Sequence, residues 1–247
     1  MGSVAIVTGG SRGIGRATSL AAAKRGYKIV VGYASNKAAA DEVVGEIEAS
    51  NGKAIAVKCD VGHEADILDL FKTADAFGKL GVLVNNAGVV DATARVDEMS
   101  AERLARMMNI NVVGSILCAR EAVKRMSSKH GGSGGVIVNL SSMAATLGSP
   151  AQYVDYAASK GAIDTFTVGL AREVSAEGIR VVGIRPGLID TDIHASGGEP
   201  DRAHRLAHTV PMKRVGTADE IANAVVWLMS DEASYITGAT IDVSGGR

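Results

Sequence analysis

The sequence lacks several features that would narrow its function at once. Its 247 residues include only two cysteines and four prolines, 4% of them are aromatic, and the 26 Lys and Arg nearly balance the 27 Asp and Glu. Without a basic stripe interleaved with aromatic residues, the chain has nothing to attract a phosphate backbone, so we expect no nucleic-acid partner. Cys59 and Cys118 stand alone in apolar runs. They predict buried thiols in a reducing compartment, with no disulfide.

The chain also lacks any apolar run of membrane-spanning length. Met1 leads almost at once into the strand-like run 4–7, without a basic region, a long apolar core or a small-residue cleavage site. These absences predict a soluble cytoplasmic protein that has no membrane partner.

What the sequence has instead is a regular alternation of short apolar, β-branched runs with longer helical patterns. Runs without in/out alternation are typical of parallel strands covered on both faces by crossover helices. The pattern predicts an α/β fold with a doubly wound parallel seven-stranded sheet, in a single domain over residues 1–247. The predicted strands are 4–8, 28–32, 54–59, 80–85, 135–141, 180–185 and 239–243.

One segment interrupts this alternation. Residues 188–210 follow the sixth predicted strand and contain Gly197, Gly198, Pro200 and three histidines, with only a short helical stretch. Such a long connection between a strand and a helix is unusual in a compact α/β domain. We expect this segment to form a lid over a substrate site.

Ligands of parallel sheets bind beyond the carboxyl ends of the strands, where helix N-termini point at anions. The first such end reads Thr8-Gly9-Gly10-Ser11-Arg12-Gly13-Ile14-Gly15. Its glycines permit a tight turn, close approach of a pyrophosphate and close helix packing. A plain glycine-rich turn is the alternative, but the strand before and the helix after favour a dinucleotide site. The residues assigned to this site are Gly9, Ser11, Arg12, Gly13, Ile14 and Gly15.

The end of the second strand distinguishes between dinucleotides. A carboxylate there would bind the adenosine ribose hydroxyls and repel a 2′-phosphate, but residues 32–37 read Gly-Tyr-Ala-Ser-Asn-Lys. Arg12 supplies a cation from the glycine loop. We therefore predict NADP(H) as the cofactor, with Arg12, Ser35 and Asn36 around its phosphate and Lys37 as a weaker candidate. The alternative is that Arg12 and Lys37 are ordinary solvated charges.

Two further strand ends carry residues that fit a cofactor wall. Asp60, followed by Val61, is placed to accept a hydrogen bond from the adenine amino group or to cap the next helix. Asn86, Ala87 and Gly88 follow the fourth strand. They either line the cofactor or form a turn, since Asn and Gly tolerate left-handed backbone.

The fifth strand and the helix after it carry the candidate catalytic groups. Tyr156 and Lys160 are four residues apart, which places both on one face of that helix. A tyrosine with its ordinary pKa of about 10 is a poor base at neutral pH, but a nearby ammonium and a positively charged nicotinamide would lower that pKa. Ser142, at the strand end, is placed to hydrogen-bond a substrate oxygen on which negative charge develops.

A helix predicted over residues 101–126 adds a fourth polar group. Its apolar stripe, in steps of three and four, predicts that Asn111 lies on the buried face. A buried amide is costly unless it is hydrogen-bonded. Asn111 therefore either satisfies an irregularity of the helix or holds a water that relays protons toward Lys160. The predicted stripe consists of Leu104, Met108, Asn111, Ser115, Cys118 and Ala122.

Together these motifs resemble the classical short-chain dehydrogenase/reductases over the whole chain, near the 3-oxoacyl carrier-protein reductases and glucose dehydrogenases. The motifs are TGGSRGIG at 8–15, NNAG at 85–88, the serine pair at 141–142, YAASK at 156–160, RPG at 185–187 and ITGATIDVSGG at 236–246. The resemblance implies a Rossmann fold with strand order 3-2-1-4-5-6-7. It also implies an NADP-dependent oxidoreductase that interconverts a carbonyl and an alcohol, and a homotetramer formed through two long helices.

The resemblance assigns roles to individual residues. Tyr156 would be the general acid/base, and Lys160 would lower its pKa and bind the nicotinamide ribose. Ser142 would orient the carbonyl, and Asn111 would complete a tetrad; register with the family motifs favours these two over Asn109 and Ser141. The implied contacts to the nicotinamide half of the cofactor are Tyr156, Lys160, Pro186, Gly187, Ile189 and Thr191, with Ile189 and Thr191 at the carboxamide.

Other interpretations stay open. A sugar or polyol dehydrogenase running toward NADP reduction would share all these motifs, whereas a catalytically silent NADP sensor would be expected to have lost part of the tetrad. The histidines at 194, 204 and 208 lack the glutamate of an HExxH motif, so we expect no metal. Basic residues beside the cleft either dock an acyl carrier protein or form a solvated face. They are Arg103, Arg106, Lys124, Arg125 and Lys129.

Overall fold

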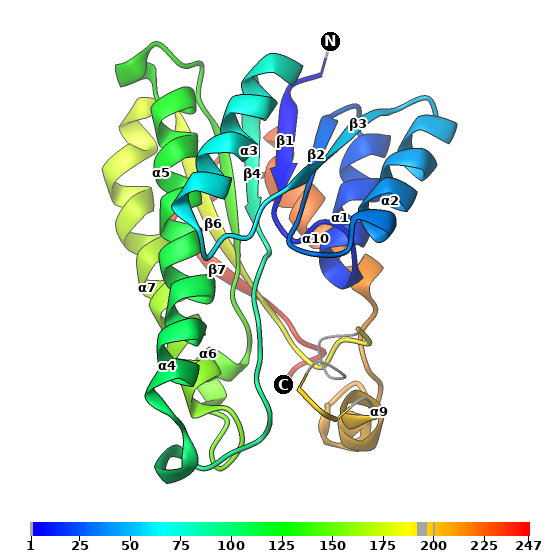
Figure 1. Cartoon of the computed structure of the whole chain (residues 1–247), viewed down its shortest axis with the longest axis vertical. Helices are drawn as coiled ribbons and strands as arrows, with labels where there is room; N and C mark the ends of the chain where they lie inside the picture. The colour runs from blue at the N-terminus through cyan, green and yellow to red at the C-terminus, as the bar shows by residue number, and fades with distance from the viewer. Residues whose placement is uncertain (1, 192–196, 200) are drawn as a thin grey trace.

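A parallel sheet forms the centre of the molecule. The computed structural model describes residues 2–191, 197–199 and 201–247. Its seven strands have the order β3-β2-β1-β4-β5-β6-β7 and lie between two groups of helices (Figure 1). The strands are β1 (Val4–Val7), β2 (Lys28–Tyr33), β3 (Lys53–Lys58), β4 (Leu80–Asn85), β5 (Gly135–Leu140), β6 (Ile179–Pro186) and β7 (Thr240–Val243). The predicted fold and strand order are confirmed, and each predicted strand agrees to within one residue at each end.

Helices alternate with the strands and cover both faces of the sheet. They are α1 (Gly13–Lys24), α2 (Lys37–Ala49), α3 (Glu64–Phe77), α4 (Ala101–Met108), α5 (Gly114–Met126), α6 (Ala144–Leu147), α7 (Val154–Val174), α9 (Arg202–Leu206) and α10 (Ala218–Met229). α1, α2 and α10 pack against one face, and α3, α5 and α7 against the other (Figure 1). The chain is therefore layered as helix, sheet and helix.

β1 shows why the strands are uniformly apolar. All four of its residues are buried. Ala5 and Val7 belong to the core beneath α1, α2 and α10, whereas Val4 and Ile6 belong to the core beneath α3, α5 and α7. A strand covered on both faces has no side that favours polar residues. Full burial of each Val or Ile side chain stabilises the fold by about 1.5–3 kcal/mol. The apolar side chains on both faces of the strand therefore hold the helices that carry the site.

The long helix predicted over residues 101–126 is interrupted. A π-helical turn over Asn109–Val113 separates α4 from α5 and accommodates one extra residue. The predicted buried stripe is therefore wrong at its start. Leu104 and Met108 are 39% and 40% exposed, and Met107 is buried instead, at 1%. Beyond the π-turn the stripe is buried as predicted.

The segment predicted as a lid runs from the end of β6 through α9. Residues 192–196 and 200, which belong to this predicted lid, lie outside the described residues. Ile189 forms an isolated parallel bridge with Gly216, which fixes the beginning of the segment beside the sheet. Within the described part of the chain, no helix combines the length and the apolarity needed to cross a membrane.

Candidate active site

A cavity lies at the carboxyl end of the sheet, lined by the first turn of α1, by segments that follow β4, β5 and β6, and by residues of α7 and α9. β1 and β4 are neighbours here although they are not consecutive, so the direction of strand order reverses at this point. In doubly wound sheets this is where ligands bind. The predicted site residues that line the cavity are Ile14, Asn86, Gly88, Ser142, Tyr156, Lys160, Pro186, Gly187, Ile189 and Thr191.

The glycine loop after β1 has the geometry of an anion site. Gly9 and Gly13 adopt left-handed backbone with φ of +62° and +51°, which other residues rarely do. A Cβ on Gly15 would lie 2.2 Å from the Gly9 carbonyl oxygen. α1 begins with no side-chain cap and no acidic residue in its first turn, so its N-terminal N–H groups fit a phosphate. Ser11 and Arg12 lie in the same turn, Arg12 with its side chain exposed.

Asn86 ties this loop to the end of β4. Its Nδ2 donates to the carbonyl oxygens of Thr8 (2.9 Å) and Gly9 (3.0 Å). The backbone N–H groups of Asn86 and Ala87 donate to Thr8 Oγ1 at 3.1 and 3.0 Å. None of residues 85–88 is in the left-handed region that a tight Asn-Gly turn would use. The segment is better described as a wall of the cavity, to which Asn86 and Gly88 contribute.

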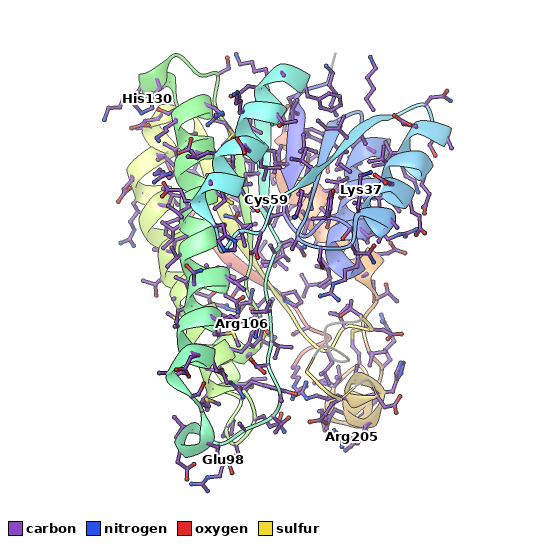
Figure 2. All side chains as sticks on the ribbon, viewed as in Figure 1. Lys37, Cys59, Glu98, Arg106, His130 and Arg205 are labelled. Carbon is purple, nitrogen blue, oxygen red and sulfur yellow. The ribbon has the colours of Figure 1, made fainter. Side chains whose placement is uncertain are left out.

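The residues after β2 are exposed and lie outside the cavity. Asn36 caps α2, because its Oδ1 accepts the N–H of Ala39 at 3.0 Å. Lys37 Nζ lies 2.6 Å from Asp41 Oδ2, and Figure 2 shows Lys37 on α2. The ion pair favours an ordinary surface charge at Lys37. Ser35 and Asn36 remain predicted contacts to a 2′-phosphate.

Asp60 stabilises the turn before α3. Its Oδ1 accepts the N–H of Gly62 at 2.9 Å, and the cap residue of α3 is His63. The alternative that Asp60 itself is the helix cap is therefore wrong, because the chain makes one more turn before the helix begins. Val61 is buried, and a Cβ on Gly114 would lie 2.5 Å from the Val61 carbonyl oxygen. Contacts of Asp60 and Val61 with adenine stay a prediction.

α7 brings the predicted tyrosine and lysine together. Both lie in its first two turns and line the cavity. Lys160 Nζ is 5.6 Å from the centroid of the Tyr156 ring and donates to the Leu140 carbonyl oxygen at 2.6 Å. Ser141 and Ser142 both line the same cavity, but the buried Ser141 donates its hydroxyl to the Lys160 carbonyl oxygen at 3.1 Å. The Ser141 hydroxyl is therefore already engaged within the chain.

The surroundings of Tyr156 act on its pKa in opposite directions. Burial raises the pKa, whereas the Ser142 hydroxyl and the positive charge of Arg202 lower it. The pKa of Lys160 is lowered to about 8, because burial disfavours the ammonium more than the charge of Asp164 favours it. Burial has the largest effect, so the pKa of Tyr156 is raised above its usual value. The lowering of its pKa by Lys160 and the nicotinamide stays a prediction.

Asn111 is buried in the π-turn and holds the segment that follows β4. Its Oδ1 accepts the N–H of Val89 at 2.8 Å, and its Nδ2 donates to Val89 O (3.0 Å) and Ser159 Oγ (3.1 Å). Asn109, by contrast, is exposed and donates to the Gly62 carbonyl oxygen. A Cβ on Gly88 would lie 3.3 Å from Asn111 Oδ1 and 3.6 Å from Lys160 Nζ. The helix irregularity is therefore present, and the water relay stays a prediction.

The residues after β6 close the cavity from the other side. The Gly187 N–H donates to the Val243 carbonyl oxygen (3.0 Å), and the Pro186 carbonyl accepts the N–H of Met143 (3.0 Å). A Cβ on Gly13 would lie 3.4 Å from Thr191, so this segment meets the glycine loop. The predicted nicotinamide contacts and the predicted pyrophosphate contacts therefore belong to one continuous surface.

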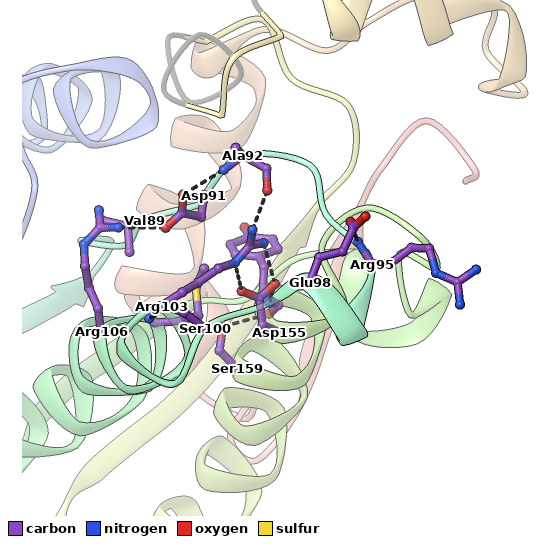
Figure 3. A network of polar contacts seen from close by, with 12 residues as sticks. Val89, Asp91, Ala92, Arg95, Glu98, Ser100, Arg103, Arg106, Asp155 and Ser159 are labelled. Carbon is purple, nitrogen blue, oxygen red and sulfur yellow. Dashed lines mark hydrogen bonds and ion pairs between the residues drawn. The ribbon is translucent and has the colours of Figure 1, made fainter.

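Most of the basic residues considered for docking are engaged within the chain. Arg103 Nε donates to Asp155 Oδ2 (2.8 Å), Nη2 to Oδ1 (3.2 Å) and Nη1 to the Ala92 carbonyl oxygen (2.7 Å) (Figure 3). Arg106 Nη1 pairs with Asp91 at 2.9 Å. Lys124 and Arg125 both contact Glu121. These pairs favour structural and solvated charges over a carrier-protein surface.

The histidines do not converge. His204 Nε2 lies 3.4 Å from Asp190 Oδ2, and His208 Nδ1 lies 3.0 Å from the Arg205 carbonyl oxygen. His194 lies outside the described residues. Within the described ranges, no three His, Cys, Asp or Glu side chains gather as metal ligands would.

The cavity contains two arginines that no sequence motif marks. Arg202 begins α9 and Arg247 follows β7, and both line the cavity. No motif or period marks either residue. The only signal was the position of Arg202 within the segment 188–210, because that segment was expected to cover a substrate. Leu188, Ile189 and Thr191 from the same segment also line the cavity.

Known proteins are similar over the whole chain. A family model described as enoyl-(acyl carrier protein) reductase matches residues 9–247. The uncharacterized oxidoreductase YgfF of Escherichia coli (strain K12) is 54% identical over 245 residues, 99% of each chain. A 3-oxoacyl-[acyl-carrier-protein] reductase of Synechocystis sp. (strain ATCC 27184 / PCC 6803 / Kazusa) is 39% identical over 98% of this chain and 96% of its own. Glucose 1-dehydrogenase 2 of Bacillus subtilis (strain 168) is also 39% identical, over 99% and 94%. A short chain dehydrogenase from Burkholderia cenocepacia J2315, solved in complex with NADP, has a TM-score of 0.91 at 32% identity, covering 100% of this chain and 98% of that one.

Proposed function

Because the chain belongs to the short-chain dehydrogenase/reductase family, we propose that this oxidoreductase uses NADP(H) to interconvert a carbonyl and an alcohol on a small substrate, in the direction of ketone reduction. The observation that carries the proposal is the convergence of Ser142, Tyr156 and Lys160 on one cavity, with Asn111 behind them. A hydroxyl pair beside a buried ammonium suits proton transfer to a carbonyl oxygen.

The residues present fit a dinucleotide. The left-handed Gly9 and Gly13, the uncapped start of α1 and the close approach at Gly15 form a cradle that side chains would fill. The pyrophosphate would be held by this loop, and the nicotinamide by the segment after β6. The full set proposed to hold the cofactor is Gly9, Ser11, Arg12, Gly13, Ile14, Gly15, Ser35, Asn36, Asp60, Val61, Asn86, Ala87, Gly88, Tyr156, Lys160, Pro186, Gly187, Ile189 and Thr191.

The chain's own groups handle the proton. When bound, NADPH supplies the hydride to the carbonyl carbon and leaves as NADP⁺. The Tyr156 hydroxyl donates its proton to the carbonyl oxygen, so that the product is an alcohol. Ser142 donates a hydrogen bond to the same oxygen as negative charge grows on it. Lys160 places a positive charge beside the tyrosine, which favours the phenolate that remains.

The test of this function is NADPH oxidation with a panel of ketones, sugars and β-ketoacyl thioesters. Tyr156→Phe removes the proton donor and should lower kcat by about 10²–10⁴-fold. The matched control is Tyr153→Phe, which removes a hydroxyl from the same cavity that contacts Thr93 (3.1 Å). Equal losses in the two variants would show that Tyr156 is not the proton donor.

The preference for NADP over NAD is supported by the absence of an acidic residue over positions 32–37 and by the NADP bound in the similar structure. Ser35→Asp places a carboxylate at this end of β2. It should weaken NADPH through charge repulsion and offer NADH a ribose partner. The measurement is kcat/KM for the two cofactors. Faster turnover with NADH by the unmodified protein would contradict the preference.

A sugar or polyol dehydrogenase is the second candidate, since a glucose 1-dehydrogenase is among the similar proteins. The same panel, run also with alcohols and NADP⁺, separates it from a ketone reductase. Tight NADPH binding without turnover on any substrate would favour the silent sensor instead. The presence of all four tetrad residues argues against that sensor.

We propose a homotetramer, because α4, the π-turn and α5 carry an exposed apolar face. Leu104 and Met108 on α4, Val113 in the π-turn and Ile116 on α5 are all exposed. Exposed large apolar side chains grouped on neighbouring elements are typical of an interface. Sedimentation should give four copies, and Met108→Glu together with Ile116→Glu should reduce their association. Sedimentation of the unmodified protein as a monomer would contradict this.

The remaining proposals concern location and the lid. Cys59 and Cys118 are buried free thiols, which is consistent with a reducing cytoplasm. We also propose that the chain is one domain and that residues 188–210 act as the substrate lid. The contribution of Leu188, Arg202 and their neighbours to the cavity supports this role.

A further inference from the structure

Positively charged side chains gather around the cavity. Its lining contains three cationic side chains, Lys160, Arg202 and Arg247. Among the described residues that line it, none is Asp or Glu. Lys160 lies beside the reacting tyrosine, so its charge already has a part in the proposed reaction. The proposed reaction gives no role to the charges of Arg202 and Arg247.

Arg202 is held in place with part of its guanidinium unused. Its Nη2 donates to Gln152 Oε1 (2.8 Å), and the group lies over the Tyr153 ring, 5.3 Å from the centroid. Its Nε is buried and has no hydrogen-bond partner within the described part of the chain. An unpaired buried donor is costly, and a guanidinium edge matches the two oxygens of a carboxylate or phosphate. The arrangement therefore fits an anion that binds to this edge.

Glu199, a carboxylate close enough to Arg202 to interact with its charge, is engaged with other groups. The hydrogen bond from Thr93 (2.8 Å) is the main cause that lowers the pKa of Glu199; the ion pair with Arg205 lowers it further, and the charge of Arg202 has a smaller effect. Glu199 is not part of the cavity lining. Figure 2 shows Arg205 on α9 at the outside of the molecule. Among the described residues, no acidic side chain lines the cavity beside Arg202.

Arg202, Arg247 and the reacting hydroxyl surround the same space. Burial lowers the pKa of Arg247, and the positive charge of Arg202 lowers it further. The charge of Arg202 also acts to lower the pKa of Tyr156, against the larger raising effect of burial. Two guanidinium groups that line one cavity repel each other, and an anion bound between them would offset that repulsion.

We propose that the substrate carries an anionic group, a carboxylate or a phosphate, that binds to Arg202 and Arg247 while its carbonyl lies against Ser142 and Tyr156. The inference rests on the proposed function, since it identifies the chemical class of substrate of that same site. It predicts that oxo acids or phosphorylated carbonyl compounds are preferred over neutral compounds of the same shape.

The experiment compares matched pairs on the NADPH-loaded protein. Acetoacetate is paired with methyl acetoacetate, and glyceraldehyde 3-phosphate with glyceraldehyde, so that each pair differs in the anion. We expect kcat/KM to favour the anionic member of at least one pair by about tenfold to a hundredfold, the range of hydrogen bonds to charged groups. Arg202→Gln should remove that preference through a higher KM for the anion, and Arg202→Lys should restore part of it. Arg205→Gln, on the same helix but outside the cavity, is the control and should keep it.

Binding is measured in parallel, so that the two proposals fail separately. Calorimetry with NADP⁺-loaded protein compares 3-hydroxybutyrate with its methyl ester, and glycerol 3-phosphate with glycerol. If the protein prefers the anionic ligand and the preference is lost in Arg202→Gln and Arg247→Gln, the inference is supported even without turnover. Absence of all turnover would count against the proposed function alone. Equal treatment of both members in both pairs overturns the inference. It is also overturned if the variants raise only the KM for NADPH, since the arginines would then serve the cofactor.

Discussion

Loss of the ion pair between Arg103 and Asp155 should be among the most destabilising changes to a charged residue of this chain. The pair joins α4 to the start of α7, and Arg103 also binds the Ala92 carbonyl after β4 (Figure 3). Their side chains are 11% and 2% exposed. Removing one partner leaves the other charge buried without compensation, which costs about 3–5 kcal/mol. For a protein of this size, about 3 kcal/mol corresponds to a decrease in Tm of roughly 6–12 °C.

The assay is thermal and urea unfolding of Arg103→Met, Asp155→Leu and the double variant. The double variant should lose less stability than the sum of the single variants, because it leaves no unpaired charge. Arg106→Met is the control. Arg106 lies on the same helix as Arg103, but its ion pair with Asp91 is more exposed, with side chains 52% and 32% accessible. Loss of this pair should lower the free energy of unfolding by no more than about 1 kcal/mol. If Arg103→Met costs no more than Arg106→Met, the reasoning from burial is refuted.

The same variants should also affect activity. Asp155 Oδ1 accepts the N–H of Tyr156 at 2.9 Å, so the ion pair orders the turn that carries the proposed proton donor. We expect Arg103→Met to lower kcat while the KM for NADPH changes little, because the glycine loop lies on the opposite side of the switch point. An increase in the KM for NADPH alone would contradict a positioning role.

Three further outcomes are expected. The pKa of Lys160 is about 8 in the folded protein and about 10.4 in an unfolded chain. Between these pH values the unfolded state binds more protons, so the free energy of unfolding of the protein should rise with pH. Urea titrations at both ends of this pH window should show the rise in the unmodified protein and lose this contribution in Lys160→Met. Burial raises the pKa of Cys59 to about 12 and raises that of Cys118, so both thiols should react with a disulfide reagent far more slowly in native than in urea-unfolded protein. In Gly15→Ala the new Cβ would meet the Gly9 carbonyl oxygen at 2.2 Å, which should weaken NADPH binding measured by fluorescence titration, whereas Gly45→Ala, with open space around it, should not.

The parts of the fold that follow from local burial could be predicted from the sequence. The strands are short runs of buried apolar residues between covering helices, and this signal is strong enough to define their ends. The π-turn could not be predicted, because one additional residue in a helix leaves no compositional trace. Its effect is nevertheless large, since it exchanges Met107 for Met108 on the buried face.

The candidate site divides in the same way. Tyr156 and Lys160 could be paired because helical spacing fixes their common face, and a strand end fixes Ser142 near them. Arg202 and Arg247 could not be identified in this way. They are brought to the cavity by an irregular segment and by the chain beyond β7, where tertiary packing, not a period, determines position.

The sheet order also separates two choices that an oxidoreductase of this kind makes. Discrimination between dinucleotides would depend on Arg12 and on residues 34–37 after β2, none of which lines the cavity. Discrimination between substrates would depend on α9, which follows β6, and on the chain after β7. Both strands lie on the other side of the switch point between β1 and β4. Duplicated genes can therefore diverge in substrate while they continue to draw on the same cellular pool of reducing equivalents. An engineer can likewise exchange one set of loops and leave the other untouched.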